Sequence, residues 1–409
     1  MNEDILILGG GPAGAMTALF LAQKNVPCTL IDKAKFPRDK ICGDALSGKV
    51  VEVLKKYNSE LVTRFATQEY EIGSWGVNFI APNLKTLRVP FKTKTSEKQE
   101  IAPGFLCKRI HFDNFLFQEL KKYPQIKIYE NTAYEKIERT EKGLEVHLDN
   151  QKVINTRLVI AADGAYSRFA KEFGNIKMEP QHYCAGIRTY YQGVKNLDPE
   201  NFIELIFLKE FLPGYLWIFP LPNNQANVGV GMRSDVIRKK KIDLKKVMNK
   251  CIQEHPFLKE RFKDAQLVDG MKGFGLPLGS KKRKISGNHF LLVGDAASLI
   301  DPFTGEGIGN AMMSGMFAAQ IAQNALETQN FSSEFLSQYD ELVYNRLGSE
   351  LRLSTVLQSL LKFPFLFNLV VNRANANPTI KNAISCMFED LDLRNQLKNP
   401  LFYLRLIFG

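Results

Sequence analysis

The chain has 409 residues, of which 45% are hydrophobic and 24% are charged, and its formal net charge is +11. This composition excludes a disordered chain, and the length favours more than one domain. The six cysteines form no Cys-x-x-Cys pair and the five histidines no ligand-spaced cluster, so we expect no metal site. Because the first strand begins almost at Met1 with no signal peptide before it, we expect a cytoplasmic protein.

Two short basic runs, 238–241 and 281–284, carry much of the positive charge. Such runs are typical of solvated loops, but a basic face also attracts anionic lipid head groups or an acidic carrier protein. Both interpretations stay open. No nucleic-acid partner is expected, because no nucleic-acid-binding signature accompanies the charge.

The first predicted elements are an apolar strand at 5–8, a Gly-x-Gly-x-x-Gly turn and a helix of small residues. Gly9 permits the tight turn, Gly11 lets a pyrophosphate approach the backbone, and Gly14 lets the helix pack closely on the strand. The next apolar run ends in Asp32, whose carboxylate suits a ribose 2′-OH and repels a 2′-phosphate. This segment therefore predicts an NAD or FAD site without distinguishing the two.

A polar loop follows at 35–47, and loops of this kind near a cofactor usually carry function. We expect it to end in a helix that starts at Ala45, with Asp44 as a candidate N-cap. Beyond it the pattern predicts strands within 70–89, an exposed loop at 91–100 and a helix at 111–122. The strands expected next are 126–129, 134–139, 144–148 and 157–161.

The middle of the chain, 182–231, is rich in aromatic residues with strand-like alternation. It predicts an antiparallel sheet inserted into the dinucleotide domain. The strands expected there are 183–191, 202–207, 215–220 and 226–232. A helix at 242–252, a last strand at 290–293 and a small-residue helix from about Glu306 complete this region.

Beyond residue 349 the chain is helical and apolar, with its main run at 351–372. Lys362 and Pro364 interrupt that run, and the terminal stretch 401–408 is shorter still. Neither reaches the roughly 20 residues that a membrane span needs. A helical cap on the core and a surface that leans on a membrane both remain open.

Four motifs that lie far apart in the sequence concern the cofactor. They are the first glycine turn with Asp32, Asp163-Gly164 after a strand, Gly294-Asp295 followed by a glycine-rich helix start, and Arg109 before a helix. A nicotinamide dehydrogenase needs only the first. An extended flavin needs a carboxylate for its ribityl hydroxyls, a second free helix N-terminus near its ring and a cation near its pyrophosphate.

In combination these motifs resemble the FAD-binding group that contains aromatic hydroxylases, flavin-dependent halogenases and geranylgeranyl reductases. The resemblance covers residues 1–320 and implies an α/β fold, in which a Rossmann-like FAD-binding domain of the glutathione-reductase type carries an inserted antiparallel β-sheet and a C-terminal helical appendage. The FAD-binding residues that it implies are Gly9, Gly11, Pro12, Ala13, Gly14, Asp32, Lys33, Cys42, Gly43, Arg109, Asp163, Gly164, Gly294, Asp295, Pro302, Gly305, Gly307 and Ile308.

We expect three domains from this resemblance. The FAD-binding domain is discontinuous and would comprise 1–75, 105–180 and 281–348. The substrate-binding sheet would comprise 76–104 and 181–280, and the helical region 349–409.

Two stretches select the branch of the group. Residues 40–44, Lys-Ile-Cys-Gly-Asp, are similar to the geranylgeranyl reductase loop whose cysteine lies near the flavin ring. Residues 215–231 fit that family's pattern Y-x-W-x-F-P-x(7,8)-G-x-G, which shapes its lipid pocket. Phenol-type halogenases differ at both places, with Trp at position 215 and Gly-Glu-Ser at 42–44. The substrate-binding residues implied are Tyr215, Trp217, Phe219, Pro220, Gly229 and Gly231.

Strand alternation puts Tyr215, Trp217 and Phe219 on one face, where they form an apolar wall that is either core or pocket. The resemblance implies an FAD-dependent reductase of carbon–carbon double bonds in a hydrophobic prenyl or polyene lipid, free or carrier-bound, with Cys42 as the candidate catalytic residue. A monooxygenase acting on an aromatic or lipid is the alternative, and a flavin-binding carrier without chemistry is a third hypothesis. No second Gly-x-Gly-x-x-Gly unit follows a strand, so the electron donor stays open between NAD(P)H and a ferredoxin-like protein. Peripheral membrane contact also stays open.

Overall fold

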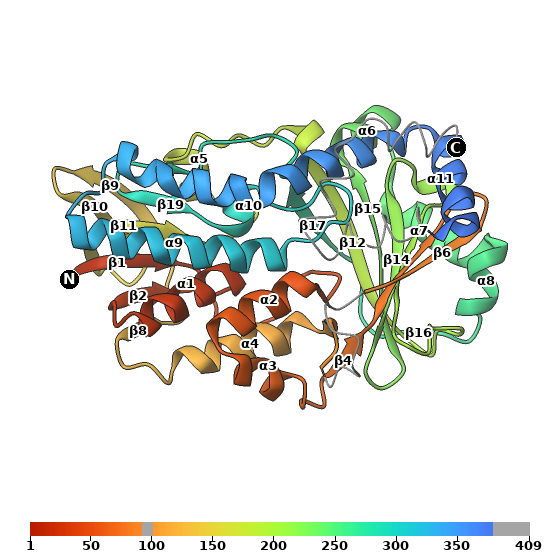
Figure 1. Cartoon of the computed structure of the whole chain (residues 1–409), viewed down its shortest axis with the longest axis horizontal. Coiled ribbons are helices and arrows are strands. Elements are labelled where there is room, and N and C mark those ends of the chain that lie inside the picture. Colours follow the sequence, from red (N-terminus) through yellow and green to blue (C-terminus); the bar gives the residue numbers. More distant parts are fainter. Residues whose placement is uncertain (92–100, 379–409) are drawn as a thin grey trace.

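The computed structural model describes residues 1–91 and 101–378. Most of the loop expected at 91–100 and all of the stretch 401–408 lie outside the described residues. Figure 1 shows an elongated molecule, with the first sheet and helices α1, α2, α4 and α9 in one half and a second sheet, with α7, α8 and α11, in the other. The expected α/β fold with an inserted sheet is confirmed.

The first sheet runs in the order β18, β19, β11, β1, β2, β8, with β10 and β9 attached to β11. The pairs from β19 to β8 are parallel, so the residues that follow β19, β11, β1 and β2 meet at one edge of the sheet. Its strands are β1 (Asn2–Leu8), β2 (Cys28–Ile31), β8 (Ile126–Tyr129), β9 (Tyr134–Thr140), β10 (Gly143–Leu148), β11 (Val153–Ala161), β18 (Ser286–Gly287) and β19 (Phe290–Leu292).

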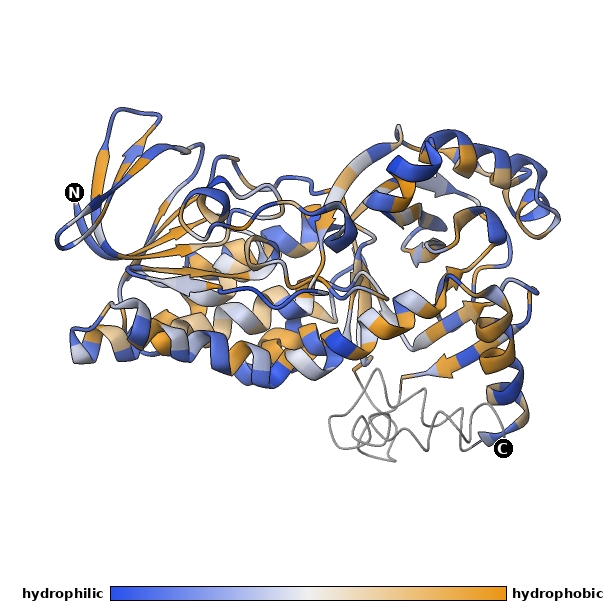
Figure 2. Ribbon diagram, turned by 90° about the horizontal axis from the view of Figure 1, so that it is seen from above, coloured by the Kyte–Doolittle hydropathy of each residue, from blue (hydrophilic) through white to orange (hydrophobic). Residues whose placement is uncertain are grey.

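Helices cover this sheet, and in Figure 2 its largely orange strands lie beside a row of helices that carry both colours. Helix α1 packs closely on α9, because a Cβ at Gly315 would lie only 2.4 Å from the Ala13 carbonyl oxygen. The helices of this half are α1 (Pro12–Gln23), α2 (Gly48–Tyr57), α3 (Ser59–Phe65), α4 (Arg109–Leu120), α5 (Arg168–Glu172) and α9 (Ile308–Thr328), with a 3₁₀ turn η3 (Gly294–Ala297).

The second sheet runs in the order β16, β12, β15, β14, β13, β5, β6, with β17 paired to β12. It is antiparallel, as expected, except that β13 and β5 pair in parallel. Its strands are β5 (Gly76–Ile80), β6 (Thr86–Pro90), β12 (Tyr183–Gln192), β13 (Ile203–Ile206), β14 (Tyr215–Leu221), β15 (Gln225–Arg233), β16 (Gln266–Leu267) and β17 (Lys272–Pro277).

One face of the second sheet packs on the helices within 244–262, and the other packs on the C-terminal helices within 357–374 and faces the first half of the molecule. The helical elements of this half are α6 (Ser234–Lys240), α7 (Leu244–Glu254) and α8 (Pro256–Phe262), with the 3₁₀ turns η1 (Pro180–His182) and η2 (Lys209–Phe211). A three-stranded sheet comprises β3 (Ala45–Leu46), β7 (Gly104–Cys107) and β4 (Glu71–Ser74), in that order.

The prediction of a helix that starts at Ala45 is wrong. Residues 45–46 pair with β7 as strand β3, and helix α2 begins at Gly48 after Ser47 as N-cap. Asp44 is therefore not a helix cap. Its backbone is left-handed (φ 67°), and its carboxylate is fully buried in hydrogen bonds with distant residues, which the local pattern does not encode.

The C-terminal helices are α10 (Ser333–Leu360) and α11 (Pro364–Ala376). Helix α10 runs without a break through residue 349, and Pro364 opens α11 at a position where proline is favoured. No described helix is by itself long and apolar enough to span a membrane. The pair α10 and α11 passes that test together but is bent by 114°.

Candidate active site

A cavity of about 590 Å³ lies where the carboxyl ends of the first sheet's strands meet β12, β14 and β17 of the second sheet. It brings together residues from motifs that are up to about 300 positions apart in the sequence. The predicted residues that line it are Gly9, Gly11, Pro12, Ala13, Asp32, Lys33, Cys42, Gly43, Arg109, Asp163, Gly164, Tyr215, Trp217, Phe219, Asp295, Gly305, Gly307 and Ile308.

The other predicted residues stand behind the lining. A Cβ at Gly14 would lie 1.9 Å from the Gly9 carbonyl oxygen, so Gly14 allows helix α1 to pack on its strand. A Cβ at Gly229 would lie 2.2 Å from Cζ2 of Trp217, so Gly229 makes room for the indole. The residues of this group are Gly14, Gly294, Pro302, Pro220, Gly229 and Gly231.

The first turn of helix α1 faces one end of the cavity. Gly9 has the left-handed backbone that the tight turn requires (φ 107°), and no described side chain caps the helix at Gly11. The N–H groups of a first helical turn have no intrahelical partners, so they can bind phosphate oxygens. A Cβ at Gly11 would meet only Nη2 of Arg38, at 3.4 Å.

Arg38, which the sequence analysis missed, is the guanidinium beside this turn. Its Nη1 donates to Oδ2 of Asp113 at 2.6 Å. Arg109 was predicted as the cation near the pyrophosphate, and it also donates to Asp113, through Nε and Nη2 at 2.6 and 2.8 Å. Burial alone would lower the pKa of Arg109, but the charge of Asp113 outweighs burial and raises it. In the sequence Arg38 comes directly after Phe36-Pro37 in the polar loop. Only the fold shows that its guanidinium reaches the glycine turn.

Two carboxylates line the same end of the cavity. Asp32 accepts hydrogen bonds from the N–H groups of Gly10 (2.7 Å) and Ala34 (2.8 Å), which leaves further lone pairs for a ribose hydroxyl. Asp163 accepts from the Tyr134 hydroxyl at 2.9 Å through Oδ2, whereas its buried Oδ1 has no partner among the described residues. Burial raises the pKa of Asp163.

The start of helix α9 forms the opposite boundary. Gly305 has a left-handed backbone (φ 73°), and a Cβ there would lie 3.0 Å from the Tyr215 hydroxyl. Gly307 is the N-cap of α9, and in the first turn of this helix the Gly309 N–H donates to Oε1 of Glu306 at 2.7 Å. Asp295 in η3 lines the cavity beside this turn. The Asp295 carboxylate and the first-turn N–H groups other than that of Gly309 thus lie where the resemblance expects the flavin ring and its ribityl chain.

The aromatic residues of β14 form one wall. Tyr215, Trp217 and Phe219 all line the cavity, and successive ring centroids are 6.3 Å apart. Because all three line the cavity, they share one face of the strand, and they also pack in a core cluster. The Tyr215 hydroxyl donates to the carbonyl oxygen of Thr304, which ties this wall to the α9 turn.

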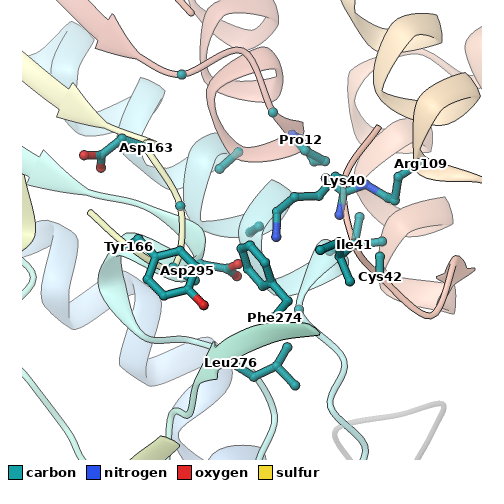
Figure 3. A pocket seen from close by; sticks show the side chains of 18 of the residues that line it. Pro12, Lys40, Ile41, Cys42, Arg109, Asp163, Tyr166, Phe274, Leu276 and Asp295 are labelled. Carbon is teal, nitrogen blue, oxygen red and sulfur yellow. The ribbon is translucent and has the colours of Figure 1, made fainter. Parts of the chain in front are cut away.

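The loop at 38–43 closes the site from the side of the first half. Figure 3 shows Lys40, Ile41 and Cys42 in the same region as Phe274 and Asp295, with Asp163 farther away. Nζ of Lys40 lies 3.2 Å from the centroid of the Phe274 ring. Burial lowers the pKa of Lys40 to about 8. Cys42 is partly exposed and lines the cavity.

The sequence analysis missed several lining residues besides Arg38. Lys40 lies inside the loop that was singled out, and Phe274 and Leu276 alternate along β17, so strand periodicity could have found both. Arg188 had no local signal. The missed lining residues discussed here are Arg38, Lys40, Arg188, Phe274 and Leu276.

The donor set fits FAD. Two helix N-termini face one cavity, a guanidinium stands beside the first, and the Asp32 carboxylate lies at the same end. These residues would hold the pyrophosphate at α1 and the flavin ring near α9.

Comparison with known proteins agrees with this geometry. A family model described as an FAD binding domain matches residues 2–342. Digeranylgeranylglycerophospholipid reductase of Thermoplasma volcanium is 30% identical over 84% of this chain and 83% of its own length, and that of Methanococcus vannielii is 30% identical over 88% and 87%.

Solved structures share the fold. A geranylgeranyl bacteriochlorophyll reductase-like protein of Thermoplasma acidophilum has a TM-score of 0.77 at 24% identity, covering 95% of this chain and 92% of that one. The flavin-dependent brominase Bmp2 has a TM-score of 0.77 at 18% identity, covering 99% and 100%. At these identities the likeness shows the fold alone. From the family match and the two reductases, the chain belongs to the geranylgeranyl reductase family of FAD-dependent oxidoreductases.

Proposed function

We propose that this enzyme reduces carbon–carbon double bonds of a prenyl or polyene lipid. The observation that carries the proposal is the aromatic wall of β14, which faces the same cavity as both helix N-termini. An unactivated alkene has no charged group to bind, so its affinity must come from burial, at roughly 0.8 kcal/mol per CH₂. The two relatives described above are digeranylgeranylglycerophospholipid reductases, which supports this substrate class.

When bound, reduced FAD supplies a hydride to one alkene carbon. Saturation also needs a proton at the neighbouring carbon, and the flavin ends oxidised. We assign the proton to Cys42 or to a water that it orders, because Cys42 lines the cavity on a loop that packs beside the aromatic wall. Tyr215, Trp217 and Phe219 orient the chain and exclude water.

The electron donor is either NAD(P)H, bound transiently at the cavity, or a ferredoxin-like protein. For the substrate we propose uptake at a membrane surface. Phe363 and Phe365, at the start of α11, are 51% and 66% exposed, and Lys362 precedes them. Exposed aromatic side chains next to a cation suit an anionic lipid surface.

The direct test is anaerobic turnover of a digeranylgeranyl glycerophospholipid by chemically reduced enzyme. We expect a saturated lipid as product under argon. A strict requirement for O₂ would instead support the monooxygenase. In the same assay Cys42→Ala should keep its FAD. Its turnover of the lipid should be about 10²–10⁴-fold slower than that of the parent, which is the range for loss of a proton-transfer group. Unchanged turnover would remove Cys42 from the mechanism.

A further inference from the structure

Asn227, on strand β15, joins the two walls of the cavity from behind. Its side chain is fully buried. Its Oδ1 accepts from Nε1 of Trp217 at 2.9 Å, and its Nδ2 donates to the carbonyl oxygen of Cys42 and to Oδ2 of Asp44, both at 2.8 Å. One side chain therefore contacts both the aromatic wall and the cysteine loop.

The orientation of this amide follows from the chemistry of its partners. The indole N–H of Trp217 can only donate, whereas a carbonyl oxygen and a carboxylate can only accept. A reversed amide would face each partner with the wrong group, so all three bonds hold only in the orientation described. The amide oxygen and both N–H groups are used.

Asp44 fixes the network from the other side. It accepts from the Tyr190 hydroxyl at 2.7 Å and from the Arg109 N–H at 3.2 Å. Burial raises the pKa of Asp44 to about 6, although the bonds from Tyr190 and Asn227 oppose the rise. Satisfied buried networks of this kind are rigid.

We propose that Asn227 is a positioning residue, which holds the backbone of Cys42 at a fixed place opposite Trp217. The inference rests on the proposed function, in which Cys42 serves the reacting alkene. Neither Asn227 nor Asp44 lines the cavity, so both act through Cys42 and Trp217. Rigid placement matters because a displacement of about 1 Å can slow a reaction about a hundredfold.

The test is an exchange of the two side chains, Asp44→Asn with Asn227→Asp. The exchange conserves charge, keeps a donor–acceptor pair between positions 44 and 227 and keeps an acceptor for Trp217. It removes the donor to the Cys42 carbonyl, since a carboxylate cannot donate. At position 44 it also puts an amide nitrogen beside the Tyr190 hydroxyl, which can accept there instead of donating. The matched control is the same exchange at a pair in the second half, Asn78→Asp with Asp198→Asn, where Nδ2 of Asn78 donates to Oδ2 of Asp198 at 3.0 Å outside the cavity.

Two readouts are measured on FAD-loaded protein. The first is alkylation by iodoacetamide, followed at each cysteine by peptide mass spectrometry with buried Cys28, in strand β2, as internal control. The second is single-turnover reduction of a digeranylgeranyl glycerophospholipid. In the exchange variant we expect the rate of Cys42 alkylation to rise by about threefold or more. The limiting rate of lipid reduction should fall about 10- to 100-fold. The half-saturating lipid concentration should change by less than about twofold.

The control should match the parent in both readouts. An exchange variant with parental alkylation and parental rate overturns the proposal. If the parent itself fails to reduce the lipid, the proposed function fails, and alkylation alone decides the positioning role. If the exchange variant does not fold, Asn227→Ser takes its place, because the shorter side chain leaves room for water and still releases the Cys42 carbonyl.

Discussion

Two glycines at the start of helix α1, Gly11 and Gly14, should respond differently to substitution. A Cβ at Gly14 would lie 1.9 Å from the Gly9 carbonyl oxygen, so Gly14→Ala must push the helix from its strand. Overpacking of this kind costs about 1–3 kcal/mol of unfolding free energy. At Gly11 the nearest atom to a Cβ is Nη2 of Arg38 at 3.4 Å, and the backbone (φ −68°) suits any residue.

Gly11→Leu should therefore fold but lose FAD. Its side chain would occupy the space where the phosphates approach the helix N–H groups. If two such charge-assisted hydrogen bonds are lost, at roughly 1.5–3 kcal/mol each, the binding free energy falls by about 3–6 kcal/mol. That loss is about two to four powers of ten in Kd.

The assay is the ratio of flavin to protein absorbance after purification, with Kd by titration of apoprotein and unfolding by circular dichroism. We expect colourless Gly11→Leu with an unfolding free energy within about 1 kcal/mol of the parent, the size of a lost N-cap preference. Gly14→Ala should show the larger loss of stability. A Gly11→Leu protein that keeps the parental Kd would refute the placement of the pyrophosphate at this turn.

Two further predictions concern the cavity walls. The pKa of Lys40 is lowered to about 8 by burial, so this lysine is charged below pH 8 and neutral above it. Anionic FAD should therefore bind more weakly as the pH rises above 8, by at most about tenfold per pH unit, and Lys40→Met should abolish that dependence in a fluorescence titration. A Cβ at Gly229 would lie 2.2 Å from Cζ2 of Trp217 and 2.4 Å from the Ile187 carbonyl oxygen. Gly229→Ala should thus displace the indole, raise KM for the lipid and leave the FAD content unchanged; an unchanged KM would show that Trp217 does not shape the lipid site.

The glycine turn at one end of the cavity was predictable from sequence because its determinants are local. Gly9, Gly11 and Gly14 lie within one turn, and their geometry is a property of adjacent residues. The single face shared by Tyr215, Trp217 and Phe219 is equally local, since it follows from strand alternation.

Other features depended on residues that only the fold brings together. The helix expected from Ala45 is a strand because β7, about 60 positions later, pairs with it. Arg38, rather than Arg109, stands beside the Gly11 turn, although both guanidinium groups bind Asp113. The sequence does not reveal which of two arginines lies nearer to a given turn.

The sequence by itself determined the cofactor class and the apolar face, because turn chemistry and periodicity are set by neighbouring residues. Only the tertiary structure decided how the cysteine loop is held. Asn227 and Asp44 are 183 positions apart, and no local pattern distinguishes them from ordinary polar residues. Their partnership exists because two sheets pack so that β15 lies behind the loop, where buried polar groups must find one another.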